Sequence, residues 1–224
     1  MRGLRILAVF VIIASALPAG AQRGMGPNAA GLSGIWHPIV GSGGAYEITD
    51  KSGKMSELEI TVVGKEDVEG KTAYWMEMAM ATGRSPGNMY MKYLIAPAGS
   101  GMTFARMIMQ QPGQDPIEMN MNIPGRGPQQ NTPSDIREKA ERVGTETITV
   151  PGGTFSCEHY RMKDGSADVW VSDKVVPWGL VKSQGKDSSM VLTKVITDAT
   201  DHITGTPKKF DPSQILRGLG QPGR

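Results

Sequence analysis

Short stretches in which apolar and polar residues alternate recur along the chain from residue 45 to residue 197. The clearest lies at 117–122, where Ile, Met and Met alternate with Glu, Asn and Asn. A period of two places successive side chains on opposite faces of a β-strand, so each stretch predicts a half-buried strand. The pattern predicts about eleven strands, at residues 45–49, 58–63, 73–81, 89–96, 102–110, 117–122, 145–150, 154–162, 167–173, 180–183 and 189–197.

Turn signals between these stretches indicate how the strands connect. Asp164-Gly165 is typical of a two-residue hairpin, because both central residues must tolerate positive φ. Pro151-Gly152 suits a type II turn. Connections this short join antiparallel neighbours, and no βαβ alternation occurs. The sequence therefore predicts a mainly β fold, which we interpret as one continuous antiparallel sheet, because two half-sheets would leave strand edges open.

One short helix is expected at residues 133–142. Thr132 offers an N-cap, Pro133 suits the first helical position, and Gly144 can end the helix. Ile136, Ala140 and Val143 are its apolar contacts, so the helix can cover a surface but cannot organise a core.

The two ends of the chain differ from the strand-rich middle. Residues 1–21 combine Arg2 and Arg5, an apolar run and an Ala-x-Ala site, which are the parts of a secretory signal peptide, and we expect cleavage before Gln22. Residues 22–34 predict a flexible lead-in, 35–198 a single β domain, and 199–224 a polar, disordered tail. After residue 21 no stretch approaches the roughly 18 apolar residues of a membrane-spanning helix, so export to the periplasm or beyond is expected.

The balance of charged residues argues against nucleic acids as partners. The 224 residues hold 24 Lys and Arg against 22 Asp and Glu, and the leader carries two of the cations and no acid. A mature chain of zero net charge does not suit a nucleic-acid binder, which needs clustered excess Lys and Arg.

Nine of the 15 methionines are arranged in one triplet and three pairs with members two residues apart, which places each set on one strand face. The candidate lining residues are Met76, Met78, Met80, Met89, Met91, Met107, Met109, Met119 and Met121. A sheet face of this kind suits an apolar ligand, because Met is unbranched and adapts its shape. The alternative is a periplasmic Cu(I) site, since thioethers are soft ligands.

No other side chains form a recognisable catalytic or metal-binding motif. His37, His159 and His202 lie far apart without metal-ligand spacing, and no nucleophile elbow, P-loop or dinucleotide fingerprint occurs. Cys157 lies two residues before His159, which raises a reactive-thiolate hypothesis, but a buried structural thiol is the preferred interpretation. We therefore assign no catalytic residue, no metal and no cofactor, and an enzyme of unknown chemistry is the third hypothesis.

Three segments carry a resemblance to known proteins: 150–160 (VPGGTFSCEHY), 168–173 (DVWVSD) and 176–182 (VPWGLVK). They resemble uncharacterised families of exported bacterial proteins, which are similar in architecture to the lipoprotein-carrier (LolA/LolB-like) half-barrels. The resemblance covers residues 145–198 and implies a curved, half-barrel-like sheet with an apolar cavity. Trp170, Pro177, Trp178 and Gly179 in these segments are interpreted as structural anchors and bends.

Taken together, the observations predict an exported, non-catalytic protein that binds a hydrophobic ligand, such as a lipid, or an envelope partner such as a lipoprotein. The sequence leaves the oligomeric state open.

Overall fold

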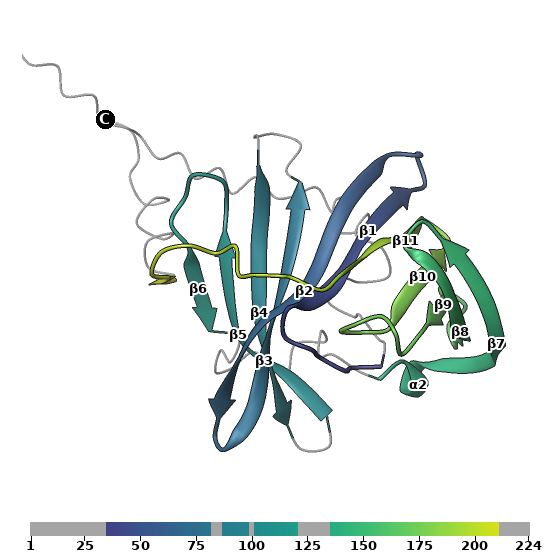
Figure 1. Cartoon of the computed structure of the whole chain (residues 1–224), viewed down its shortest axis with the longest axis horizontal. Helices are drawn as coiled ribbons and strands as arrows, with labels where there is room; N and C mark the ends of the chain where they lie inside the picture. Colours follow the sequence, from purple (N-terminus) through teal and green to yellow (C-terminus); the bar gives the residue numbers. More distant parts are fainter. Residues whose placement is uncertain (1–34, 82–86, 99–100, 121–134, 211–224) are drawn as a thin grey trace, which may run out of the picture.

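The computed structural model describes residues 35–81, 87–98, 101–120 and 135–210. These residues form one open, curved sheet of twelve strands, in the spatial order β12-β6-β5-β4-β3-β2-β1-β11-β10-β9-β8-β7 (Figure 1). The first six strands are β1 (Ser42–Asp50), β2 (Met55–Val68), β3 (Lys71–Ala81), β4 (Asn88–Ala98), β5 (Gly101–Gln110) and β6 (Ile117–Asn120). After helix α2 (Ile136–Lys139) follow β7 (Ala140–Val150), β8 (Gly153–Met162), β9 (Ala167–Val171), β10 (Leu180–Gly185), β11 (Ser188–Ile196) and β12 (Lys208–Lys209).

The mainly β, curved antiparallel fold predicted from the alternation is confirmed. Each of the eleven predicted strands has a counterpart, and the pairs of sequential neighbours that the structure describes are antiparallel. The expected signal peptide, the lead-in at 22–34 and residues 211–224 lie outside the described residues.

Strand β1 joins the two parts of the sheet. It pairs with β2 on one side and with β11 on the other, both antiparallel. The β1–β11 ladder therefore joins the meander β1–β6 to the meander β7–β11, so β1 makes the sheet continuous. This arrangement follows the preference for paired strand edges.

The strands β7 to β11 curl back on themselves at the right of Figure 1. The backbone N–H of Gly152, in the β7–β8 turn, donates to the carbonyl of Leu192 on β11 at 3.0 Å. A Cβ at position 152 would lie 2.9 Å from Leu192 Cγ, so this close approach requires glycine. The Tyr46 hydroxyl also spans the curl, donating to the Leu180 carbonyl at 3.1 Å.

The main hydrophobic core lies inside this curl and extends along β1 to β3. Its fully buried members include Leu58, Ile60, Val171, Leu192 and Met76. A second, smaller cluster lies on the opposite side of the sheet. It consists of Ala73, Trp75, Leu94, Ala96 and Ile108.

The helix is shorter than the sequence predicted. Asp135 is its N-cap and accepts a hydrogen bond from the Arg137 backbone N–H at 2.9 Å, and the helix ends at Lys139. Ala140, placed in the helix by the sequence analysis, opposes Met162 as the first residue of β7. An isolated helix of about ten residues is marginal, whereas pairing with β8 satisfies the backbone along eleven residues, so the strand prevails. Thr132 and Pro133 lie outside the described residues.

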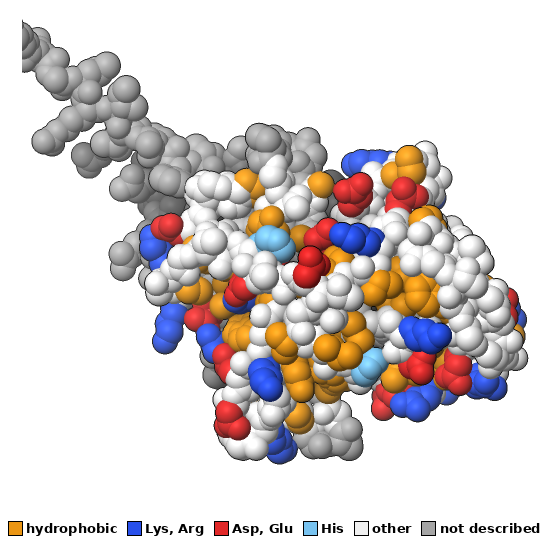
Figure 2. All heavy atoms as spheres, in the orientation of Figure 1, with side chains coloured by type: hydrophobic (Ala, Val, Ile, Leu, Met, Phe, Trp, Pro, Cys, Tyr) orange, Lys and Arg blue, Asp and Glu red, His pale blue; other side chains and the backbone are white. Residues whose placement is uncertain are grey.

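Residues 199–210 differ from the disordered tail expected for 199–224. We call them the strap, because they cross the face of the sheet over β3, β4 and β5 (Figure 1). Two of them form β12, which pairs parallel to β6; two residues show no alternation, so the sequence could not reveal this strand. Figure 2 shows the face that the strap crosses, where acidic and basic side chains lie among apolar ones.

Candidate apolar binding face and the strap on its opposite side

Residues directly opposite each other on neighbouring strands lie on the same face of a sheet, so the register groups the methionines. One row across β3–β6 is Met78, Met91, Met109 and Ile117, and the next is Met76, Tyr93, Met107 and Met119. A shorter row pairs Met80 with Met89. We call these ten residues the methionine face.

The methionine face contains no charged residue among the described parts of β3–β6, and it changes in burial from one end to the other. Met76 and Met78 are 1% and 2% exposed and belong to the main core. Met91, Met107 and Met109 are half-buried. The face is therefore a continuation of the core that becomes accessible toward β5 and β6.

The predicted lining residues thus fall into two groups. Met76 and Met78 are core residues, while Met80, Met89, Met91, Met107, Met109 and Met119 are half-buried. Met121 lies outside the described residues. The register brings eight of the nine candidates onto one face, whereas the alternation in the sequence places only the members of each pair together.

The core end of the methionine face is fixed by tryptophans. Trp178 is 2% exposed, and its indole N–H donates to Met76 Sδ at 3.1 Å. The ring of Trp36 packs against Trp178 with centroids 4.5 Å apart. Backbone N–H groups of Ile35 and His37 donate to the carbonyls of Trp178 and Pro177. Trp178 therefore acts as an anchor inside the fold.

The other residues of the same motif have separate roles. Gly179 has φ of 73°, and a Cβ there would lie 3.0 Å from the Ser172 carbonyl oxygen, so the bend requires glycine. Trp170 lies on the outer side of the curl, stacked on His159 at 4.5 Å and donating to Glu146 at 2.6 Å. The Lys182 ammonium lies over the Trp170 ring, 4.9 Å from its centroid.

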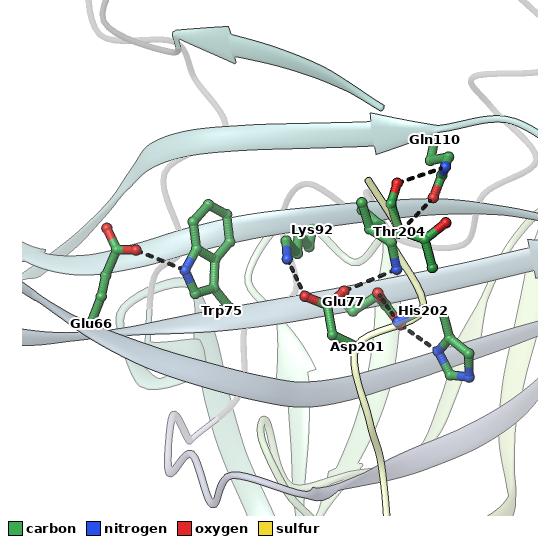
Figure 3. Close-up of polar contacts among 9 residues, drawn as sticks. Glu66, Trp75, Glu77, Lys92, Gln110, Asp201, His202 and Thr204 are labelled. Carbon is green, nitrogen blue, oxygen red and sulfur yellow. Dashed lines mark hydrogen bonds and ion pairs between the residues drawn. The ribbon is translucent and has the colours of Figure 1, made fainter. Parts of the chain in front are cut away.

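The opposite side of β3–β6 carries the strap, and charged side chains lie there beside the smaller apolar cluster (Figure 3). Glu77 is 1% exposed, and its carboxylate pairs with His202 Nδ1 at 2.7 Å and accepts the His202 backbone N–H at 3.2 Å. Burial raises the pKa of Glu77, and the hydrogen bonds from His202 oppose that effect. Asp201 forms an ion pair with Lys92 on β4.

Apolar packing and further hydrogen bonds hold the strap along its length. Ile203 packs against the smaller cluster around Trp75, and Gln110 bonds twice to Thr204. The His202 ring also stacks on Tyr90, with centroids 5.0 Å apart. Glu77 is the one charged residue in the apolar stretch 73–81, and that feature of the sequence could have indicated a buried partner.

A groove of about 510 Å³ lies beside the end of the strap, with Leu94, Lys209 and Phe210 in its lining. Its most prominent cation, Arg106, already bonds Glu66 at 2.9 Å and Glu118 at 2.6 Å, and its guanidinium lies 5.1 Å from the Trp75 ring centroid. Two of the donors of Arg106 are therefore engaged within the protein.

The histidines and the cysteine do not combine into a reactive site. His159 contacts Glu146 at 3.1 Å and Asp168 at 2.7 Å through its two ring nitrogens, so neither nitrogen is directed at Cys157. Cys157 is 1% exposed, and burial raises the pKa of its thiol to about 11. The interpretation of Cys157 as a buried thiol is confirmed.

Two further observations concern metals and membranes. Within residues 35–81, 87–98, 101–120 and 135–210, no three side chains among His, Cys, Asp and Glu are grouped to hold a metal ion. In the same part of the chain, no helix has the length and apolar character needed to cross a membrane.

Comparison with known proteins gives likenesses in structure only. No family model matches the chain, and no curated protein matches it. It is similar to a "putative lipoprotein" from Parabacteroides distasonis, at 16% identity and a TM-score of 0.36, over 73% of this chain and 99% of that one. It is also similar to a "putative exported protein" with a YmcC-like fold from Bacteroides fragilis, at 15% identity and a TM-score of 0.35, over the same shares. The resemblance to lipoprotein carriers stays a prediction.

Proposed function

We propose that this protein is an exported, non-catalytic binder of an apolar ligand, and that the methionine face holds an alkyl chain such as the acyl chain of a lipid or lipoprotein. The observation that carries the proposal is the cross-strand register, which joins the methionine pairs into uncharged rows continuous with the core.

The dimensions of the methionine face suit a chain better than a point ligand. Four adjacent strands are about 14 Å across, at about 4.8 Å per interval. In the row from Met78 to Ile117, Met78 is buried in the core, so Met91, Met109 and Ile117 offer the accessible apolar contact, over three strands or about 10 Å. Burying one methylene contributes about 0.8 kcal/mol, so an alkyl chain laid along a row gains affinity with each carbon it places there.

The residue type supports the same conclusion. Met has three rotatable bonds and a polarizable sulfur, so a Met-lined surface adapts to ligands of varied shape. Of the two sulfurs with a described donor, Met76 Sδ accepts from Trp178 in the core and Met91 Sδ accepts from the Tyr93 hydroxyl at 3.9 Å. Copper would use only two to four of these thioethers and would not require the extended rows.

A matched pair of variants on β4 tests the proposal with a fluorescent fatty acid as the probe. Met91→Lys puts a charge in the centre of the methionine face, and we expect it to weaken fatty-acid binding at least about tenfold, because a buried unpaired ammonium is strongly unfavourable. Asn88→Lys adds the same charge on the same strand at an exposed position of the opposite face, and it should leave binding unchanged. Equal binding by the two variants would refute the proposed location.

Replacing Met91, Met107, Met109 and Met119 together by Leu separates the apolar function from copper binding. Leu nearly conserves the volume of Met, so the fold and fatty-acid binding should persist. If Cu(I) binds the wild type and is lost in this variant, while neither protein binds fatty acid, the copper function replaces the one proposed here.

A further inference from the structure

All but one of the sulfur atoms in this chain are methionine thioethers. The chain has one cysteine and 15 methionines. Cys157 is buried, and its thiol has a pKa of about 11, so little nucleophilic thiolate forms near neutral pH. The sulfurs available to an oxidant outside the cell are therefore those of accessible methionines.

The sulfurs of the methionine face belong to side chains that differ in solvent exposure. Met76 and Met78 are at most 2% exposed, and the Met76 sulfur also accepts the Trp178 indole N–H. By contrast, Met91 and Met109 are half-buried and directly opposite each other, as are Met107 and Met119. These four half-buried methionines, which we call the oxidisable patch, are close neighbours across β4, β5 and β6.

Oxidation of a thioether by a peroxide is a balanced two-electron step. A sulfur lone pair attacks one peroxide oxygen, an S–O bond forms, and the O–O bond breaks. The transferred oxygen gives up its proton, and the departing oxygen takes up a proton and leaves as water, or as an alcohol if the oxidant is an alkyl hydroperoxide. The sulfur is oxidised to the sulfoxide and the peroxide is reduced, which turns an apolar side chain into a polar one.

We propose that the oxidisable patch is a modification site, at which a peroxide converts Met91, Met107, Met109 and Met119 to sulfoxides and thereby releases the apolar ligand; the release step rests on the function proposed above. A sulfoxide oxygen needs hydrogen bonds that an alkyl chain cannot provide, so covering it with ligand is unfavourable. Because Met76 and Met78 are shielded, the core and the fold persist through the change. Enzymatic reduction of the sulfoxides restores the apolar face.

Peptide mapping by mass spectrometry after treatment with hydrogen peroxide measures the rate at each methionine of the full exported protein. Met55, which is 63% exposed, is the internal standard for an accessible thioether. We expect the four methionines of the oxidisable patch to react at measurable rates below that of Met55, while Met76 and Met78 stay unmodified in the folded protein. Equal rates at Met76, Met78 and the four patch residues would overturn the modification site.

Fatty-acid titration of the same samples tests the release. Oxidised wild type should bind at least about tenfold more weakly than untreated protein, regain affinity after treatment with methionine sulfoxide reductase, and keep its circular dichroism spectrum throughout. The Met→Leu variant at the four positions should bind equally well before and after peroxide. Unchanged affinity of the oxidised wild type would overturn the release. If untreated wild type binds no fatty acid, the proposed function and the release both fail, while the oxidation rates still decide the modification site.

Discussion

Gly43 on β1 provides a quantitative test of the junction between the two parts of the sheet. It opposes Thr61 on β2 and Ile196 on β11, so it lies within the strand that makes the sheet continuous. A Cβ built at position 43 would lie 2.2 Å from the Ile60 carbonyl oxygen and 2.7 Å from Thr61 Cα. Both atoms belong to the backbone of β2, so no side-chain rotation can relieve the overlap in Gly43→Ala. β1 and β2 must move apart, which disturbs the β1–β2 ladder of the strand whose other edge pairs with β11.

We expect Gly43→Ala to lower the free energy of unfolding by about 3 kcal/mol or more, at the upper end of the range for overpacking. For a domain of this size that corresponds to a melting temperature about 6 to 12 °C lower. Thermal and urea unfolding followed by circular dichroism measure both quantities.

Gly64→Ala on the neighbouring strand is the matched control. A Cβ there would lie 3.8 Å from Trp75 Cδ1, which is ordinary contact. We expect this control to melt at or slightly above the wild-type temperature, because Ala reduces the entropy of the unfolded chain. If Gly43→Ala melts with the control, the argument from the close approach of β1 and β2 is wrong.

Three further predictions concern single groups. Burial raises the pKa of Glu77, so its contribution to stability is fully present below the unfolded pKa of about 4.3 and is lost as the pH rises through the folded value. The stability of Glu77→Gln relative to wild type should therefore increase from pH 4 to pH 7 in urea titrations, and a difference independent of pH would contradict this. Cys157 should react slowly with a thiol reagent in the folded protein, and Cys157→Ala should cost no more than about 3 kcal/mol in unfolding experiments; rapid labelling would show that the thiol is accessible. Exported material should begin at Gln22 by intact mass, and a chain that retains Arg2 would exclude cleavage.

The fold was largely predictable because burial on one side of a sheet leaves a period of two in the sequence. The stretch at 117–122 forms β6 as far as residue 120. The hairpin indicated by Asp164-Gly165 joins β8 and β9, but its turn was predicted wrongly: four residues connect the strands, and of the pair Gly165 alone has positive φ. The predicted extent of the helix, residues 133–142, was wrong because the helix ends at Lys139. Ala140 favours a helix by its intrinsic propensity, but its pairing partner Met162 is not visible locally, and pairing with β8 decides the structure.

The candidate site was predictable in its parts but not in its assembly. Alternation identifies that Met107 and Met109 share a face, because that relation is local. Which residues oppose them depends on the register with β4 and β6, which is set by bulges such as the one between Leu94 and Ile95. The strap was missed because the partners Glu77 and His202 are 125 residues apart.

Calorimetric titration of the wild type with fatty acids of increasing chain length tests the central claim most directly. If the methionine face holds an alkyl chain, affinity should increase by up to about fourfold for each added CH₂, corresponding to about 0.8 kcal/mol. The heat capacity change on binding should be negative, as expected for burial of apolar surface. Affinity that does not change with chain length, or no binding at any length, would contradict the proposed function.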